Sequence, residues 1–147
     1  MRIVEVASEG GRLAGAEWLA RAEGVHRQLR PQLAADYTGK MERVLAGAGA
    51  RMALAVEGEA VRGLAVYRWH ENTFDGLKFY VDDLVTDEPC RSRGVGHVLV
   101  SHLENVARGL GAGSLVLDSG TQRTQAHKFY FREGFVITSF VFKKPLP

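Results

Sequence analysis

The residues best suited to chemistry lie in a basic, glycine-containing stretch, Arg91-Ser92-Arg93-Gly94-Val95-Gly96. Glycine lets a backbone turn tightly and approach a ligand without a Cβ in the way. The free N–H groups of a first helical turn and the positive end of the helix dipole bind anions. The guanidinium groups of Arg91 and Arg93 suit phosphate. We therefore interpret this stretch as a pyrophosphate cradle.

Two neighbouring carboxylates, Asp82 and Asp83, precede the cradle. A carboxylate can take a proton from a substrate, directly or through water, or attract a cation. Adjacent residues of a strand face opposite sides of a sheet, so both can point at one substrate only where a bulge intervenes. We favour Asp82 as the residue that faces the substrate. The other carboxylate, Asp83, would accept a hydrogen bond from the backbone or pair with an arginine.

The elements around the cradle are a strand and a helix. Residues 77–86 are rich in β-branched and aromatic side chains, which is typical of a strand. After the glycines, apolar residues from Val95 to Leu110 recur at spacings of three and four, which predicts an amphipathic helix. The cradle thus joins a strand to the start of a helix.

The rest of the chain supplies further strands and helices. We predict a first strand over 1–7, helical segments over 11–29 and 37–45, a β-hairpin of 52–56 and 61–69, a loop over 70–76, a strand over 114–118, a helix over 126–133 ended by Gly134, and a last strand over 135–143. This order predicts an α/β fold class, a mixed sheet of about six strands with helices on both faces. The 147 residues are expected to form a single domain, 1–147.

Composition excludes several classes. The formal net charge of +2 and the dispersed arginines argue against a nucleic-acid partner. No apolar run approaches the ~20 residues of a membrane span, and the N-terminus lacks a signal-peptide core. Cys90 is the only cysteine, so neither a disulfide framework nor a cysteine-based zinc site is expected. The histidines show no metal-binding spacing. We expect a cytoplasmic protein without a metal.

Two further stretches make the pattern specific. One is Asp82-Asp83-Leu84-Val85-Thr86-Asp87, and the other is Ala126-His127-Lys128-Phe129-Tyr130-Phe131-Arg132-Glu133-Gly134-Phe135. Together with Arg91-x-x-Gly94-x-Gly96 they resemble the signature motifs of the GNAT superfamily of acyl-CoA N-acyltransferases. The resemblance is strong over 77–136 and architectural before that. It implies a GNAT-like sheet that splays between its fourth and fifth strands, here 84–86 and 114–118.

The resemblance implies that acetyl-CoA, as co-substrate, lies along the end of the preceding strand and in the cradle. The pantetheine arm would hydrogen-bond the exposed backbone of Leu84, Val85 and Thr86. The pyrophosphate would lie on the main-chain amides of residues 91–96, followed by His97 in the first helical turn. No metal is implied.

The resemblance also suggests catalytic residues. Tyr130 matches the tyrosine that protonates the departing CoA thiolate, and Asp118 matches a polar position near the reacting thioester. Asp82 and Asp83 match an acidic pair of small-amine acetyltransferases in which the first residue is often Glu. An aspartate reaches one methylene less far, so the base stays open between Asp82, Asp83 and a water. Acetyl transfer can be direct, without a covalent enzyme intermediate, so Cys90 is not required as a nucleophile.

The expected acceptor is the primary amine of a small molecule. An aromatic wall of Trp69, His70, Phe74 and Phe79 would suit such an acceptor. Two other functions stay open: an acyl-CoA-binding sensor without turnover, and transfer to a protein amine. Family habit suggests a homodimer that uses the apolar segment 135–142.

Other phosphate-binding motifs do not fit the cradle. A nucleotide P-loop needs Gly-Lys followed by Ser or Thr, whereas Gly96 is followed by His97 and Val98. A dinucleotide-binding fold needs a third glycine and a loop directly after the first strand, and the chain has neither there.

Overall fold

The computed structural model describes residues 1–147, which divide into two compact units, Met1–Val116 and Leu117–Pro147. The strands are β1 (Arg2–Glu9), β2 (Arg12–Ala14), β3 (Arg51–Glu57), β4 (Ala60–Asn72), β5 (Gly76–Thr86) and β6 (Leu115–Leu117). The helices are α1 (Leu19–Leu29), α2 (Tyr37–Glu42), α3 (Val95–Leu110) and α4 (Thr124–Arg132), with 3-10 turns at Ala16–Trp18 and Glu88–Cys90 and a π-helical turn at Arg43–Gly47.

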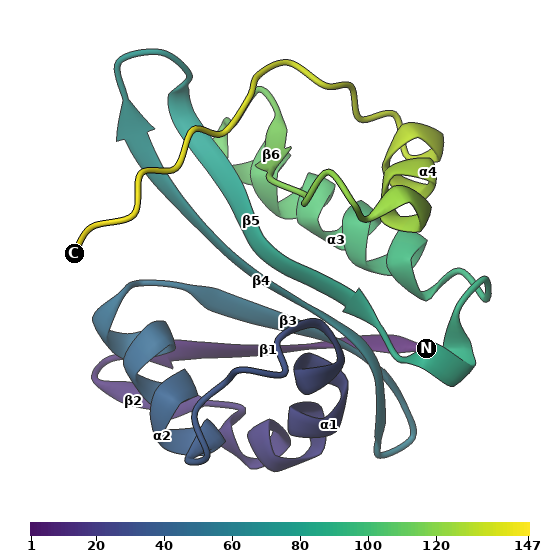
Figure 1. Cartoon of the computed structure of the whole chain (residues 1–147). Helices are drawn as coiled ribbons and strands as arrows, with labels where there is room; N and C mark the ends of the chain where they lie inside the picture. The colour runs from purple at the N-terminus through teal and green to yellow at the C-terminus, as the bar shows by residue number, and fades with distance from the viewer. The chain divides into compact units, whose positions relative to one another are not determined.

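The strands form one sheet in the order β2-β1-β3-β4-β5-β6 (Figure 1). From β2 to β5 every neighbouring pair is antiparallel. Helix α3 then separates β5 from β6 along the chain. The alternation of strands and helices with this sheet confirms the predicted α/β class. The predicted hairpin, the strand that carries Asp82 and Asp83, and the helix after the cradle are also confirmed.

One face of the sheet is covered by α1 and α2. In β3 the side chains of Met52, Leu54 and Val56 are fully buried and join the hydrophobic core formed with these helices. Helix α1 contributes an apolar stripe of Leu19, Ala22 and Val25, and α2 contributes Tyr37 and Met41. Through this core α1 packs on β4 and β5, and α2 packs beside α1.

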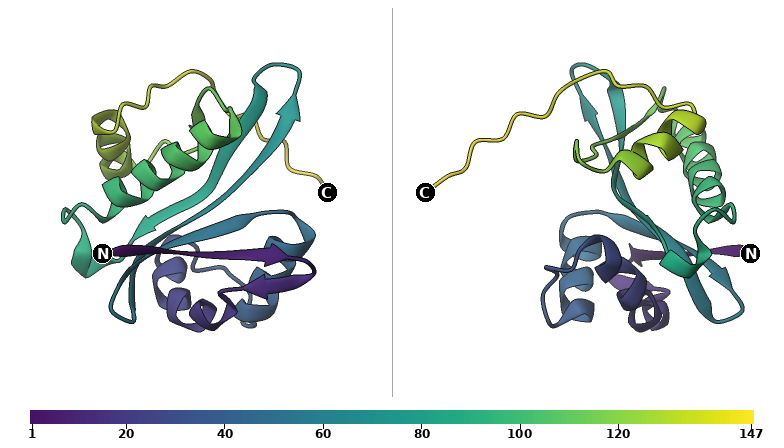
Figure 2. Two further views of the ribbon diagram at one scale, coloured as in Figure 1. Left: turned by 180° about the vertical axis from the view of Figure 1, so that it is seen from behind. Right: turned by 45° about the vertical axis from the view of Figure 1, so that its right-hand side comes forward.

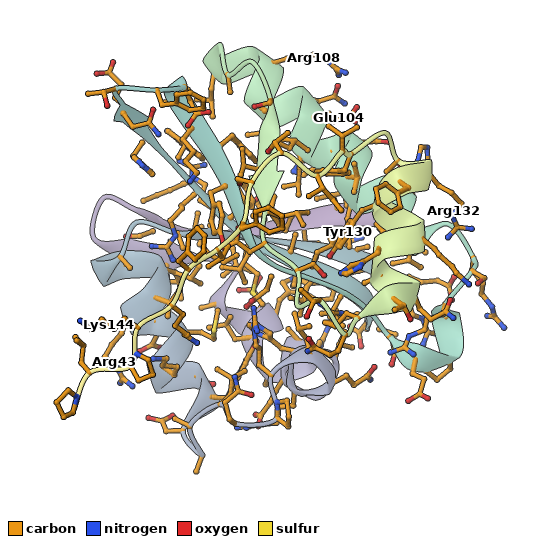
Figure 3. All side chains as sticks on the ribbon, turned by 45° about the horizontal axis from the view of Figure 1, so that its top comes forward. Arg43, Glu104, Arg108, Tyr130, Arg132 and Lys144 are labelled. Carbon is orange, nitrogen blue, oxygen red and sulfur yellow. The ribbon has the colours of Figure 1, made fainter.

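The other face is covered by α3, as the two views of Figure 2 show. Ala53 and Ala55 alternate with the residues that face α1, so their small side chains point to the α3 side. A Cβ added at Gly63 of β4 would lie 2.6 Å from Val95 Cγ1 and 3.1 Å from Leu99 Cδ1, so the helix approaches this strand closely. On the outer side of α3, Arg108 pairs with Glu104 at 3.2 Å (Figure 3).

Three sequence predictions about elements differ from the structure. The loop predicted over 70–76 is shorter, because β4 extends to Asn72 and β5 begins at Gly76. The segment predicted as helical from Gly11 begins instead with β2, because Gly10 and Gly11 both have positive φ and turn the chain back beside β1. The last strand predicted over 135–143 does not form. A strand requires a partner ladder, and residues 136–147 are exposed and belong to no sheet. Their apolar character alone therefore did not determine their conformation.

The second unit contains α4 and the C-terminal segment. Helix α4 agrees with the predicted helix over 126–133, and Gly134, with φ of 90°, follows its last turn as predicted. The N–H of Phe135 bonds the carbonyl of Tyr130 at 3.0 Å, which closes the helix. No helix of the structure has the length and apolar character needed to cross a membrane.

Candidate functional site

A β-bulge in β5 places the acidic pair. Val66 of β4 is opposite Asp83, whereas the next residue, Tyr67, is opposite Val81, so Asp82 is the extra residue. A bulge lets two neighbouring side chains avoid the strict alternation of a strand. As a result Asp82 and Asp83 both line one cavity. The condition that the sequence analysis set for a joint role of the two carboxylates is met.

The cavity has a volume of about 210 Å³ and lies among α1, α2, β4 and β5. Its charged and titratable lining side chains are His26, Arg30, Lys40, Arg68, Asp82 and Asp83. Leu33, Met41, Val44 and Val66 give it an apolar side. All of these residues belong to the first unit. The cavity thus combines several charged side chains with an apolar side, and small-molecule sites also combine polar groups with apolar surface.

A buried hydrogen-bond chain holds Asp83. His26 is only 1% exposed, and its Nε2 lies 2.7 Å from Asp83 Oδ2. Its Nδ1 lies 2.8 Å from the hydroxyl of Tyr37, which is equally buried. Arg30 donates from Nε to Asp83 Oδ1 at 2.8 Å. Both oxygens of Asp83 are therefore engaged by groups from α1 and its C-terminal end.

These partners determine how Asp83 titrates. Burial by itself would raise the pKa of the Asp83 carboxyl, but the hydrogen bonds from His26 and Arg30 outweigh it and hold that pKa below its ordinary value. Burial, reinforced by the charges of Glu23 and Asp83, raises the pKa of the Tyr37 phenol. At neutral pH, Asp83 is thus ionised and Tyr37 is neutral.

Asp82 has a different environment. Arg68 of β4 donates from Nε to Asp82 Oδ2 at 2.7 Å, and the side chain of Asp82 is about twice as exposed as that of Asp83, at 29% against 14%. Its second carboxylate oxygen has no hydrogen-bond partner within the chain. Of the two carboxylates, Asp82 is therefore the one that has an oxygen available for a ligand in the cavity.

The cradle also has the geometry expected of an anion site. Gly94 has φ of 81°, and α3 begins at the next residue without a side-chain cap. A Cβ on Gly94 would meet no atom within 4 Å, so the loop surface is open there. Residues 91–94 are exposed, and Ser92 also has a positive φ of 63°. The first N–H groups of a helix lack intrahelical acceptors and are available to an anion.

The other predicted cofactor and catalytic residues lie on β5 and in the second unit. Leu84, Val85 and Thr86 form the C-terminal end of β5 and pair on one side with β4. Asp118 follows β6, and Tyr130 lies on α4 (Figure 3). The ring of Tyr130 is buried between those of Phe129 and Phe135, at centroid distances of 5.7 and 5.6 Å.

Some predicted site residues do not line the cavity. Phe79 is fully buried and stacks on Tyr67 and Trp69, and Phe74 is exposed at the turn between β4 and β5. The aromatic wall proposed from the sequence therefore does not line this cavity. No group of three or more His, Cys, Asp or Glu side chains lies together in the structure as a metal site would require.

Sequence reasoning missed His26, Tyr37, Arg30, Arg68 and Lys40. One signal was present. His26 directly follows Val25 on the buried stripe of α1, and a polar side chain in such a position needs a partner. The partner could not be read from the sequence, because Asp83 is 57 residues away.

A model of the acetyltransferase (GNAT) family matches residues 15–135. The chain belongs to the GNAT acetyltransferase family. It is accordingly an acetyl-CoA-dependent N-acetyltransferase. The resemblance noted from the cradle and the Phe-Tyr motif is thereby confirmed.

Individual relatives agree with this assignment. The GNAT protein is 33% identical over 132 residues to YhdJ, an uncharacterized N-acetyltransferase of Bacillus subtilis (strain 168), a match that covers 88% of this chain and 92% of YhdJ. It is 36% identical over 66 residues to an aminoalkylphosphonate N-acetyltransferase of Salmonella typhimurium (strain LT2), a match that covers 45% of this chain and 43% of that protein.

A solved structure has the same fold. An aminoglycoside N-acetyltransferase in complex with CoA superposes with a TM-score of 0.82 at 17% identity, over 99% of this chain and 93% of that chain. At this identity the similarity establishes the GNAT fold of the present chain and no more.

Proposed function

We propose that this GNAT enzyme transfers the acetyl group of acetyl-CoA to the primary amine of a small molecule by direct attack. The observation that carries the proposal is the bulge that brings Asp82 and Asp83 to the wall of one cavity. Two carboxylates in a small cavity suit a substrate that arrives as an ammonium ion and must lose a proton before it attacks.

The two carboxylates would have different roles. Asp83, which His26 and Arg30 keep ionised, is a poor proton acceptor, and its charge would contribute beside Asp82 to binding of the ammonium group. Asp82 has a free oxygen and greater exposure, so it would receive the proton of the amine, directly or through a water. This assignment agrees with the preference for Asp82 that the sequence suggested.

Acetyl-CoA would be held by β5 and the cradle. Backbone groups of Leu84, Val85 and Thr86 would bind the pantetheine arm. The amides of residues 91–97, with Arg91 and Arg93 beside them, would bind the pyrophosphate. The open surface at Gly94 and the uncapped start of α3 support this placement.

The bond changes balance with these groups alone. The amine nitrogen forms a bond to the thioester carbon, and the carbon–sulfur bond breaks to release the CoA thiolate. The ammonium group loses one proton to Asp82 or water before it attacks, and the bonded nitrogen then loses a second proton to solvent. The thiolate takes a proton from the Tyr130 hydroxyl, which solvent restores. The family resemblance supports Tyr130 as this acid and Asp118 as a polar group near the thioester.

The size of the cavity supports a small acceptor. Its volume of about 210 Å³ is below the range of roughly 300–1,000 Å³ that drug-sized ligands occupy. The Salmonella relative is named for an aminoalkylphosphonate, which is also a small amine.

Two copies of the chain would pair through the C-terminal segment. Five large apolar residues of this segment are at least two-thirds exposed: Val136, Ile137, Phe140, Val141 and Phe142. A single chain leaves this surface in water, and a second copy would cover it. Light scattering should give twice the 16.1 kDa chain mass, and a monomeric mass would contradict the pairing.

Calorimetric titration with acetyl-CoA, followed by a thiol-release assay over a panel of amines, tests the proposed function. We expect one binding event per chain and thiol release that depends on the amine. Absence of acetyl-CoA binding would refute the cradle. Binding without release for any small amine would favour a sensor or a protein acceptor.

A further inference from the structure

The cations around the cavity outnumber the carboxylates. Arg30, Lys40 and Arg68 carry three positive charges, against two negative charges on Asp82 and Asp83. Each carboxylate already has a guanidinium partner at 2.7 Å. The ammonium group of Lys40 has no ion-pair or hydrogen-bond partner in the structure. The excess charge of the cavity is therefore the charge of Lys40.

The two guanidinium groups retain donors that their carboxylates do not use. Arg30 uses Nε and Nη2 on the acidic pair, and its Nη1 has no partner. Arg68 uses Nε on Asp82 and Nη1 on the carbonyl of Ala48, and its Nη2 has no partner. Three cationic side chains that line the cavity thus retain donors for an anion outside their existing ion pairs. Such charge-assisted contacts are the strong ones for carboxylates and phosphoryl groups.

Lys40 is held at the cavity by the local structure of α2. The carboxylate of Asp36 caps this helix by accepting from the Gly39 N–H at 3.0 Å, and Tyr37 and Met41 anchor its buried side. Lys40 and Val44, one turn apart, line the cavity beside Met41. The backbone position of Lys40 thus follows from packed neighbours, whereas its long side chain is exposed to solvent.

We propose that the acceptor is an aminoalkyl acid, a small molecule with a primary amine at one end and a carboxylate, phosphonate or sulfonate at the other. The amine would lie at Asp82, and the acidic group would lie among Lys40, Arg30 and Arg68. The apolar side of the cavity, formed by Leu33, Met41, Val44 and Val66, would contact the methylene chain. This inference rests on the proposed function and gives its substrate class.

The charges also exclude a class of amines. A diamine or polyamine would bring a second positive charge to a cavity that already has an unpaired ammonium group, and like charges at close range disfavour binding. An alkylamine has no second charged group, so it would avoid that repulsion but leave Lys40 unpaired. The expected order of catalytic efficiency is therefore aminoalkyl acid, then alkylamine, then diamine.

The test uses acceptors matched in length with acetyl-CoA in a thiol-release assay: 4-aminobutyrate, 3-aminopropylphosphonate, butylamine and 1,4-diaminobutane. For the wild-type enzyme we expect kcat/KM for the better acid to exceed that for butylamine by about tenfold or more, the effect of one charge-assisted hydrogen bond. Lys40→Gln should lower this ratio by about tenfold, mainly through KM. Lys40→Glu should reverse the order of the acids and diaminobutane.

Lys78→Gln is the matched control. It removes the same charge from β5, where Lys78 lies over the Tyr80 ring and does not line the cavity. This variant should keep the wild-type ratio. Calorimetric acetyl-CoA affinity of each Lys40 variant checks that its fold is intact.

The outcomes separate the two proposals. Preference of the wild-type enzyme for butylamine or diaminobutane would overturn the aminoalkyl-acid assignment and leave the acetyltransferase proposal in place. An acid-to-butylamine ratio unchanged in Lys40→Gln would also overturn it. Absence of thiol release with all four acceptors and with a wider amine panel would overturn the small-amine function and this inference with it.

Discussion

Replacement of Asp83 by asparagine tests whether His26 and Arg30 stabilise the negative charge of Asp83 or only pack against its side chain. The asparagine side chain would have nearly the same volume, but its amide group would face donors on both sides. A hydrogen bond to a charged group contributes about 1.5–3 kcal/mol. The bond from the buried His26 falls in this range. The side chain of Arg30 is 41% exposed, so solvent screens its ion pair and reduces its contribution to a small fraction of that energy. We expect Asp83→Asn to lower the free energy of unfolding by about 2–3 kcal/mol at pH 7.

The cost of Asp83→Asn should decrease as the pH falls. The pKa of Asp83 is lowered by folding, so its contribution to stability is present above the unfolded-state value of 3.8 and is lost as pH falls through the lower folded-state value. Asparagine does not titrate. The unfolding free energies of the wild type and Asp83→Asn should therefore begin to converge below about pH 4.

Urea unfolding at pH 7 and at steps down to pH 3 measures both effects, with far-UV circular dichroism as the signal. Asp87→Asn is the control, because Asp87 keeps a hydrogen bond from Gln28 and lies 4.0 Å from Arg62. It should cost less than about 1 kcal/mol at pH 7. A cost below about 0.5 kcal/mol for Asp83→Asn, the size of one weak hydrogen bond, or a cost that stays constant on acidification, would refute the reasoning.

Three further substitutions probe the cradle, the acid and the packing of α3. Gly94→Leu should abolish calorimetric acetyl-CoA binding while costing only about 1–2 kcal/mol of stability for its positive φ, and undiminished affinity would remove the cradle from the binding site. Tyr130→Phe should lower kcat far more than acetyl-CoA affinity, and an unchanged kcat would assign the acid elsewhere. Gly63→Ala should destabilise the fold by about 1–3 kcal/mol, because its Cβ would lie 2.6 Å from Val95 Cγ1 and 3.0 Å from the Val85 carbonyl oxygen. An unfolding temperature equal to that of the wild type would contradict the close approach of α3 to β4.

The sequence by itself determined the local elements and the family. The change from strand-like residues to apolar spacings of three and four located β5, the cradle and α3, because these signals depend on neighbours within a few residues. The glycine at 94 also indicated a special backbone conformation before its φ was known. The Phe-Tyr motif and the cradle together identified the GNAT family.

Only the tertiary structure decided how the candidate site is built. The bulge at Asp82 arises from the register of β4 against β5, and no local pattern distinguishes it from a regular strand. The partners of Asp83 come from α1 and its C-terminal end, far away in the sequence, so they follow from how the helix packs on the sheet. The last strand was mispredicted because strand formation also depends on tertiary pairing. Residues 135–143 have strand-forming side chains, but a strand exists only where another strand pairs with it.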